Sequence, residues 1–245
     1  MQEGLKDCKK QNVIIIIPTY NEAENITFLV KNIFFHNPEF FILIVDDNSP
    51  DGTSYKVRDM QNQYPHLCLI NRECRLGLGS AYVKGFKYAL EKGYDVIIQM
   101  DADLSHSSFY ITKMLDLFDE YDLVIASRYT QGGGVSNWSL LRIILSRTAN
   151  IFSKVLLRIP IDDLSSGFKC IKRNVVEKIN FSTIQSRGYA FQIEEVYRVF
   201  FKGFKIKEYP IVFKGRKNGK SKMSFWIIVE TFFKVIFLCI KRNFR

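Results

Sequence analysis

Two aspartates separated by a single alanine end an apolar segment in the stretch VIIQMDADLSH, residues 96–106. Alternate side chains of an extended chain face the same way, so Asp101 and Asp103 can converge on one cation. Two carboxylates suit Mg²⁺ or Mn²⁺, which keep coordination sites for water and for substrate phosphates. The alternative is that Asp103 or Ser105 caps a following helix while Asp101 is only solvated.

Two more acidic loops follow apolar runs nearer the N-terminus. PTYNE (18–22) follows VIIIIP (13–18), and DDNSPDG (46–52) follows FFILIVD (40–46). Open α/β sheets bind their ligands at the carboxyl ends of the strands. The three acidic loops are therefore predicted to meet at one edge of one sheet and to form a single site.

Apolar runs alternate with helical patterns along the first half of the chain. Further runs are LCLIN (67–71), YDVIIQMD (94–101) and YDLVIAS (121–127), and amphipathic helices are expected at 79–91 and 107–119. Nearly continuous apolar, β-branched strands are typical of a parallel sheet covered on both faces. The alternation therefore predicts an α/β fold.

The pattern changes after about residue 130, but no linker composition separates the two halves. A glycine run, QGGGV (131–135), precedes predicted helices at 139–158 and 190–201 and predicted strands at 167–172 and 204–213. We therefore expect one domain with a C-terminal elaboration.

Composition narrows the class of partner. The chain has 245 residues, of which 47% are hydrophobic and 24% charged, and this balance is typical of a folded domain. The net charge of +10 favours a phosphate-rich substrate, a nucleic acid or an anionic membrane surface. Aromatic residues are not interleaved with basic ones in a strand pattern, which argues against nucleic acid. Five scattered cysteines indicate free thiols, and the three histidines lack the spacing of a zinc site.

The segment SFWIIVETFFKVIFLCIKRNFR, residues 224–245, is the most membrane-like part of the chain. Glu230 and Lys234 interrupt it, and a membrane span needs about 20 clean apolar residues. We expect a helix that lies in the membrane interface, with an amphipathic helix packed on the core as the alternative. The polar N-terminus lacks the apolar region of a signal peptide.

The motifs, taken in order, resemble glycosyltransferase family 2 with the GT-A fold, and within it the dolichyl-phosphate (polyprenyl-phosphate) mannosyltransferases. The resemblance covers nearly all of residues 13–240. It is carried by PTYNE, DDNSPDGT, GLGSAYVKG (77–85), MDADLSH (100–106), SRY (127–129), LSRTAN (145–150), DLSSGFK (163–169), GYAFQIE (188–194) and GKSK (219–222).

The resemblance implies an α/β GT-A fold: a mostly parallel sheet covered by helices on both faces, with C-terminal amphipathic helices at the membrane. It divides the chain into a polar tail (1–12), the glycosyltransferase domain (13–222) and a membrane-interface helix (223–245). It also implies inverting, Mg²⁺- or Mn²⁺-dependent transfer of mannose from GDP-mannose to dolichyl or another polyprenyl phosphate. The product would serve protein glycosylation or GPI-anchor-type pathways.

The implied location is the cytosolic face of the endoplasmic reticulum or of a bacterial inner membrane. Attachment would be peripheral, either direct or through a small membrane-anchored subunit. Two alternatives stay open at this point. One is a glucosyltransferase that uses UDP-glucose, and the other is a non-catalytic membrane-associated relative.

The resemblance also assigns roles to residues by position. The donor GDP-mannose would contact Pro18, Tyr20, Glu22, Val45, Asp47, Asp101, Ala102, Asp103, Arg128, Arg216 and Lys222. The metal would be held by Asp101, Asp103 and Ser105, and catalysis would use Asp103, Arg128, Arg142, Ser146 and Arg147. Arg142, Ser146 and Arg147 would meet the lipid phosphate, and Glu194 would have an orienting role.

These roles make physical sense for a reaction in which a nucleoside diphosphate leaves. A dication and basic side chains stabilise the charge that grows on the leaving group. A lipid phosphate is already largely anionic at neutral pH, so it needs no general base.

Arg142 and Ser146 share a helical face, whereas Arg147 is rotated by roughly 140° from Arg142. A helix that is both basic and apolar suits a membrane surface, with an ordinary core helix as the alternative.

Overall fold

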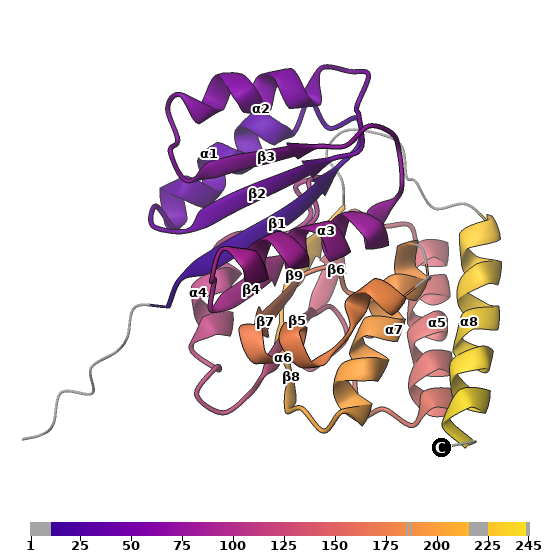
Figure 1. The fold of residues 1–245 in the computed structure, drawn as a ribbon. Coiled ribbons are helices and arrows are strands. Elements are labelled where there is room, and N and C mark those ends of the chain that lie inside the picture. Colours follow the sequence, from indigo (N-terminus) through magenta and orange to yellow (C-terminus); the bar gives the residue numbers. More distant parts are fainter. Residues whose placement is uncertain (1–10, 185, 187, 216–224, 244–245) are drawn as a thin grey trace, which may run out of the picture.

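The structure is a computed structural model, and it describes residues 11–184, 186, 188–215 and 225–243. In this part of the chain a seven-stranded sheet has the order β3-β2-β1-β4-β7-β5-β8 (Figure 1). The strands are β1 (Val13–Thr19), β2 (Phe41–Asp46), β3 (Leu67–Asn71), β4 (Val96–Gln99), β5 (Leu123–Ser127), β7 (Lys169–Lys172) and β8 (Ile206–Pro210).

Most neighbouring strands are parallel. β1 pairs in parallel with β2 and β4, β2 with β3, and β5 with β8, whereas β7 runs antiparallel between β4 and β5. A separate two-stranded sheet joins β6 (Gly134–Ser136) to β9 (Val212–Lys214). The predicted α/β fold with a mostly parallel sheet is confirmed.

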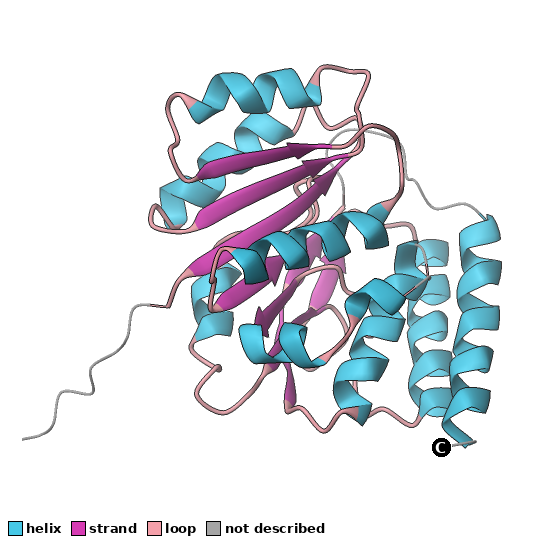
Figure 2. Cartoon of the chain, viewed as in Figure 1, coloured by secondary structure: helices cyan, strands magenta, loops and turns pink. Residues whose placement is uncertain are grey.

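Helices cover both faces of the large sheet, as Figure 2 shows. The α1 (Ile26–His36), α2 (Thr53–Gln61) and α4 (Tyr110–Leu115) helices share a core cluster with one face. The other face packs against α3 (Leu78–Glu91), α6 (Arg173–Lys178) and α7 (Gly188–Phe201). A 3-10 turn (Phe181–Thr183) precedes α7. Beyond α7 lie α5 (Leu140–Leu157) and α8 (Phe225–Asn243), side by side.

The isoleucine run of β1 shows why the strand is continuously apolar. Ile14 and Ile16 belong to the core on the α3 face, while Ile15 and Ile17 belong to the core on the α1 face. Since successive side chains of a strand point to opposite faces, a strand covered on both sides buries every residue.

Three predicted elements differ from the structure in ways that bear on the site. The helix expected at 107–119 is confined to α4, so neither Asp103 nor Ser105 caps a helix there. The strand expected at 94–101 ends at Gln99, because the backbone N–H of Asp101 then donates to His106 Nδ1 and the chain turns. The strand expected at 204–213 divides into β8 and β9, because β9 leaves the large sheet to pair with β6.

The C-terminal helix packs on the domain and also leaves apolar side chains uncovered. Val235 and Leu238 are buried in the core, whereas Phe233 and Phe237 are exposed. None of the helices in the described segments is long and apolar enough to cross a bilayer.

Candidate active site

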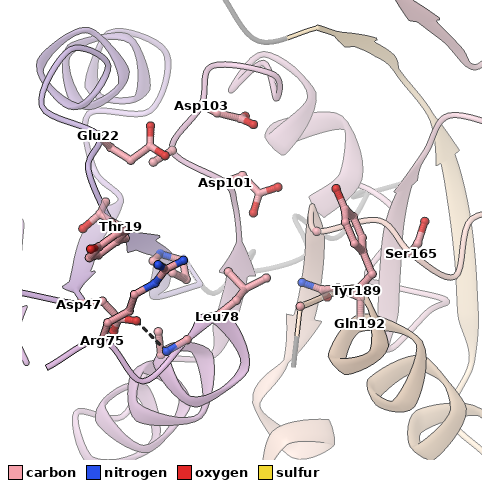
Figure 3. A pocket seen from close by; sticks show the side chains of 17 residues that line it. Thr19, Glu22, Asp47, Arg75, Leu78, Asp101, Asp103, Ser165, Tyr189 and Gln192 are labelled. Atoms are coloured by element: carbon pink, nitrogen blue, oxygen red, sulfur yellow. Dashed lines mark hydrogen bonds between the residues drawn. The ribbon is translucent and has the colours of Figure 1, made fainter. Parts of the chain in front are cut away.

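The strand order reverses at β1, because β2 lies on one side of it and β4 on the other. In open α/β sheets this reversal leaves a crevice at the carboxyl ends of the strands. A cavity of about 270 Å³ lies there, between the loops after β1, β2 and β4 and the start of α7 (Figure 3). It is lined by Pro18, Thr19, Tyr20, Glu22, Asp47, Arg75, Gly77, Leu78, Ala81, Asp101, Ala102, Asp103, Ser165, Gly167, Gly188, Tyr189 and Gln192.

One end of this cavity is shaped by Asp47. Its Oδ2 accepts hydrogen bonds from the backbone N–H groups of Leu76 and Gly77, at 3.2 and 2.7 Å, and its Oδ1 lies 2.7 Å from Arg72 Nη1. Gly77 has φ +91°, a conformation that side chains with a Cβ rarely adopt. Asp47 therefore fixes the turn that starts α3, in addition to lining the cavity.

Tyr20 and Arg75 form a flat wall at the same end. The Arg75 guanidinium lies 4.2 Å from the centre of the Tyr20 ring. A stacked aromatic and guanidinium pair can receive a planar base or its ribose. Sequence analysis did not select Arg75. Val45, by contrast, is fully buried in the core and does not line the cavity, so its predicted contact with a base stays a prediction.

The loop after β4 holds the two carboxylates on the cavity wall. Asp103 is nearly buried, and its Oδ1 accepts hydrogen bonds from the backbone N–H and the hydroxyl of Ser105. Leu104, between them, has φ +62°, so the loop turns sharply. Ser105 itself bonds to Asp103 and does not line the cavity, so its predicted contact with a metal stays a prediction.

His106 supports the Asp101 side of the loop. Its Nδ1 accepts the Asp101 backbone N–H at 3.2 Å, and its Nε2 lies 4.0 Å from Asp101 Oδ2. Burial lowers the pKa of His106, although the carboxylates of Asp101 and Asp103 oppose the shift. A neutral imidazole that accepts at Nδ1 carries its proton on Nε2, toward Asp101.

Gly167 comes close to the Asp101 carboxylate. A Cβ at position 167 would lie 3.0 Å from Asp101 Oδ2, so a larger residue would displace this carboxylate. Ser165 and Gly167, from the segment before β7, thus line the cavity beside Asp101.

The donor set of this loop fits a small hard dication. Two carboxylate groups leave most of an octahedral shell to water and substrate phosphate, as Mg²⁺ and Mn²⁺ require. In the described part of the chain, no group of three or more His, Cys, Asp or Glu side chains is arranged to hold a metal. A dication here would depend on the two aspartates and on oxygen atoms of its ligand.

A second cavity of about 310 Å³ adjoins the first, and the two share Ser165 and Tyr189. Its walls come from α5, α7 and α8 and are mostly apolar. The lining residues are Arg128, Trp138, Arg142, Leu145, Ser146, Thr148, Ala149, Asn150, Phe152, Ser153, Ser165, Tyr189, Ile193, Thr231, Phe232 and Val235.

Arg128 lies in the wall of this second cavity and not in that of the first. Its Nε and Nη2 bind the Asp163 carboxylate at 2.7 and 2.6 Å, and Nη2 also donates to Ser165 Oγ. Burial would lower the pKa of Arg128, but Asp163 raises it above the usual value, so the guanidinium stays charged. None of these bonds uses Nη1.

Arg142 and Ser146 reach the same cavity from one face of α5. The Arg142 guanidinium lies 4.0 Å from the Trp138 ring centre, and Ser146 Oγ accepts the Tyr129 hydroxyl at 2.6 Å. Arg147 is exposed and does not line this cavity. Arg142 and Ser146 are thus brought to Arg128, while Arg147 is not.

The α5 helix buries polar side chains and exposes apolar ones, which is the reverse of an ordinary surface helix. The residues that it buries are Asn150, Ser153 and Leu157, and Asn150 Nδ2 donates to Ser165 Oγ. Several of its apolar residues are nevertheless exposed, together with several on the neighbouring α8. These are Leu140, Leu141, Ile144, Leu145, Ile151 and Val155 on α5, and Phe232, Phe233, Phe237 and Ile240 on α8. We call this set the apolar face.

Glu194 joins α7 to α8 and lines neither cavity. Its carboxylate accepts from Arg198 at 2.6 Å and from Ser186, and lies 2.8 Å from Lys234 Nζ. Burial would raise the pKa of Glu194, but the hydrogen bonds from Lys234, Ser186 and Arg198 outweigh burial and lower it. Lys234, which interrupts the apolar C-terminal segment, is thereby paired.

Two predicted donor contacts, Arg216 and Lys222, lie outside the described residues. Among the cavity residues, sequence analysis missed Arg75, Ser165, Tyr189 and Gln192 as site residues. Ser165 lies in the quoted motif DLSSGFK, and Tyr189 and Gln192 lie in GYAFQIE; these motifs are the signal that could have selected them.

The chain belongs to glycosyl transferase family 2, whose family model matches residues 14–180. Two curated relatives are more specific in name. The chain is 43% identical over 227 residues to a polyprenol monophosphomannose synthase of Mycolicibacterium smegmatis, covering 92% of this chain and 86% of the relative. It is 36% identical over 218 residues to an undecaprenyl-phosphate mannosyltransferase of Micrococcus luteus, covering 89% and 90%.

Solved structures support the fold. Glucosyl-3-phosphoglycerate synthase from Mycobacterium tuberculosis, in complex with Mn²⁺, UDP-glucose and phosphoglyceric acid, superposes with a TM-score of 0.70 at 13% identity. The match covers 94% of this chain and 80% of that one. The Mg²⁺ and UDP complex of the same enzyme also matches with a TM-score of 0.70.

Proposed function

We propose that this glycosyltransferase moves mannose from GDP-mannose to a polyprenyl phosphate, with inversion, at a membrane surface. The observation that carries the proposal is the pair of adjoining cavities, one acidic at the strand ends and one apolar with two arginines. The names of both curated relatives, a polyprenol monophosphomannose synthase and an undecaprenyl-phosphate mannosyltransferase, support the same acceptor and sugar.

The first cavity would hold the donor. The end lined by Tyr20, Asp47 and Arg75 suits a base and ribose. The loop that carries Asp101 and Asp103 suits the diphosphate with its dication. The same fold binds UDP-glucose with Mn²⁺ in glucosyl-3-phosphoglycerate synthase. A bound Mg²⁺ or Mn²⁺ would supply positive charge to the diphosphate as it leaves. Arg216 and Lys222 are proposed to add charge from their loop.

The second cavity would hold the acceptor. A polyprenyl phosphate has an anionic head and an apolar tail, and this cavity has Arg128 and Arg142 within mostly apolar walls. Ser146 would donate to the same phosphate. Because the phosphate is already anionic, the arginines need only orient it and screen its charge.

The reaction is a direct displacement. A phosphate oxygen of the acceptor attacks the anomeric carbon, and the bond from that carbon to the GDP oxygen breaks with its electron pair leaving on GDP. Attack from the side opposite the leaving group inverts the anomeric centre. The reacting atoms would meet near Ser165 and Tyr189, where the two cavities adjoin.

The apolar face would rest on the membrane. Contiguous exposed apolar side chains on two neighbouring helices mark an interaction surface, and this face continues outward from the cavity proposed for the lipid. We propose peripheral attachment at the cytosolic face of a membrane. Alkaline carbonate should then release the protein from membranes.

The test is transfer of radiolabel. GDP-mannose or UDP-glucose is supplied with a polyprenyl phosphate and Mg²⁺, and chloroform-soluble label is counted. We expect label from GDP-mannose. Label from UDP-glucose alone would make the mannose assignment wrong, and no label from either donor would favour the non-catalytic alternative.

A further inference from the structure

Gln192 is a buried amide that faces the first cavity and makes one side-chain hydrogen bond in the described structure. It lines the cavity from α7 and is only 1% exposed. Its Oε1 accepts a hydrogen bond from Lys169 Nζ, whereas Nε2 has no partner among the residues that the structure describes. A buried N–H group without a partner costs free energy, so a ligand that accepts from it gains affinity.

Lys169 fixes which end of the amide faces the cavity. Both Lys169 and Glu195 are 0% exposed, and Lys169 Nζ lies 2.8 Å from Glu195 Oε2. An ammonium group only donates, so it selects the oxygen of Gln192 and directs the nitrogen away from itself. Figure 3 shows the nitrogen of Gln192 on the cavity side.

The position of Gln192 indicates which part of the donor it meets. Asp47 and Arg75 lie at the other end of the cavity, with Asp101 between (Figure 3). On the Gln192 side lie Ser165 and Tyr189, which also line the second cavity. A transferred group must lie between its leaving diphosphate and the acceptor, and Gln192 lines this interval.

We propose that Gln192 Nε2 donates a hydrogen bond to a hydroxyl oxygen of the transferred sugar, and that buried Lys169 is its positioning residue. The proposal rests on the proposed function and names a sugar contact for it. A site built to pair with a hydroxyl discriminates against sugars that present none at that point. The two motifs DLSSGFK and GYAFQIE would thus meet at one sugar contact.

The test compares the dissociation constants of GDP and GDP-mannose in the presence of Mn²⁺, by calorimetry. In Gln192→Met, which keeps the volume and leaves the Lys169–Glu195 pair intact, GDP should bind as in the unmodified protein. GDP-mannose should bind roughly threefold to tenfold more weakly, which is the usual worth of one neutral hydrogen bond. Thermal unfolding checks that the variant folds.

Gln99→Met is the matched control. Gln99 pairs with Lys169 across the β4–β7 ladder, is fully buried, and has an amide without partners in the described structure, but it does not line the cavity. The ratio of the two dissociation constants should not change in this variant. If Gln192→Met does not fold, Gln192→Asn, which withdraws the amide by one methylene, should show the same selective loss.

Positioning by Lys169 has its own readout. In Lys169→Met/Glu195→Met both buried charges are removed together, which often leaves stability nearly unchanged. The affinity for GDP-mannose relative to GDP should fall. Adding Gln192→Met should then lower it little further, because the amide has already lost its hydrogen bond from Lys169. Full additivity of the two losses would overturn the positioning role.

Failure of this inference is distinguishable from failure of the proposed function. Suppose that the unmodified protein transfers mannose, and that Gln192→Met weakens the binding of GDP and of GDP-mannose equally or weakens neither. This result would overturn the sugar contact alone. An unmodified protein that transfers no mannose would overturn the proposed function.

Discussion

The two cavities of this molecule are built from different parts of the fold. The first lies at the ends of β1, β2 and β4, and four of the five charged side chains in its wall are carboxylates. The second lies among α5, α7 and α8, and its charged side chains are Arg128 and Arg142 in apolar surroundings. If each binds a phosphate group, the first needs an intervening dication, whereas the second can pair directly.

The two cavities also differ in how rigidly their charged side chains are held. Asp101 and Asp103 follow a strand buried on both faces and are held by His106 and Ser105. Arg142 and Ser146 depend on α5, which buries two polar residues and one leucine and exposes six apolar side chains. We expect the first cavity to be intact in solution, and the second to depend on what covers the apolar face.

The largest expected effect concerns the acidic cavity. Asp103→Ala removes a carboxylate proposed to hold the dication and should lower mannosyl transfer by on the order of 10²–10³. Removal of divalent metal with a chelator should have a comparable effect that Mg²⁺ or Mn²⁺ reverses. Asp119→Ala, at an exposed site away from the cavity, is the control. Unchanged transfer in a folded Asp103→Ala variant would remove the metal from the account.

A smaller effect is expected in the second cavity. Arg142→Met should raise the KM for polyprenyl phosphate by about tenfold to a hundredfold, the worth of a hydrogen bond to a charged group. The affinity for GDP should not change, because Arg142 does not line the first cavity. Arg147→Met, at the exposed position next to Ser146, should have a weaker effect. Equal effects at both arginines would contradict the assignment of this cavity.

The apolar face should respond to the loss of exposed side chains. Ile144→Gln combined with Phe233→Gln removes two of them and should weaken binding to anionic vesicles roughly tenfold or more, from the transfer free energy of the lost groups. GDP affinity should stay the same. Phe35→Gln, on α1 and more exposed than either residue, is the control and should leave vesicle binding intact. Sedimentation with vesicles measures both.

The smallest effect concerns the link between α7 and α8. Because the pKa of Glu194 is lowered in the folded state, its contribution to stability is present above the unfolded pKa near 4.5 and is lost as pH falls through the lower folded value. Glu194→Gln should therefore unfold at a lower temperature at neutral pH, and the difference should shrink in acid. A difference in unfolding temperature that is the same at every pH would contradict stabilisation by an ionised Glu194.

Much of the acidic cavity was predictable from the sequence because its parts follow apolar runs directly. The apolar runs that lead to Tyr20, Asp47 and Asp101 have the pattern typical of a doubly covered parallel sheet, and such strands end at one edge. The antiparallel β7 was not predictable, since its direction depends on how the 140–168 segment returns to the sheet.

The residues that were missed join segments far apart in the sequence. Lys169 meets Gln192 and Glu195 only once β7 and α7 are packed, and Arg75 meets Tyr20 only once the loops after β3 and β1 come together. His106 was judged by its lack of metal-ligand spacing, which says nothing about its bond to the Asp101 backbone. Periodicity reports which face a residue occupies, and it does not report the partner on the facing element.

The most direct test of the account is a crystal structure of the protein with GDP-mannose and Mn²⁺. The account predicts an anomalous Mn²⁺ peak coordinated by Asp101, Asp103 and diphosphate oxygens, with the sugar between that metal and Tyr189. A diphosphate bound elsewhere, with only solvent beside the two aspartates, would contradict it.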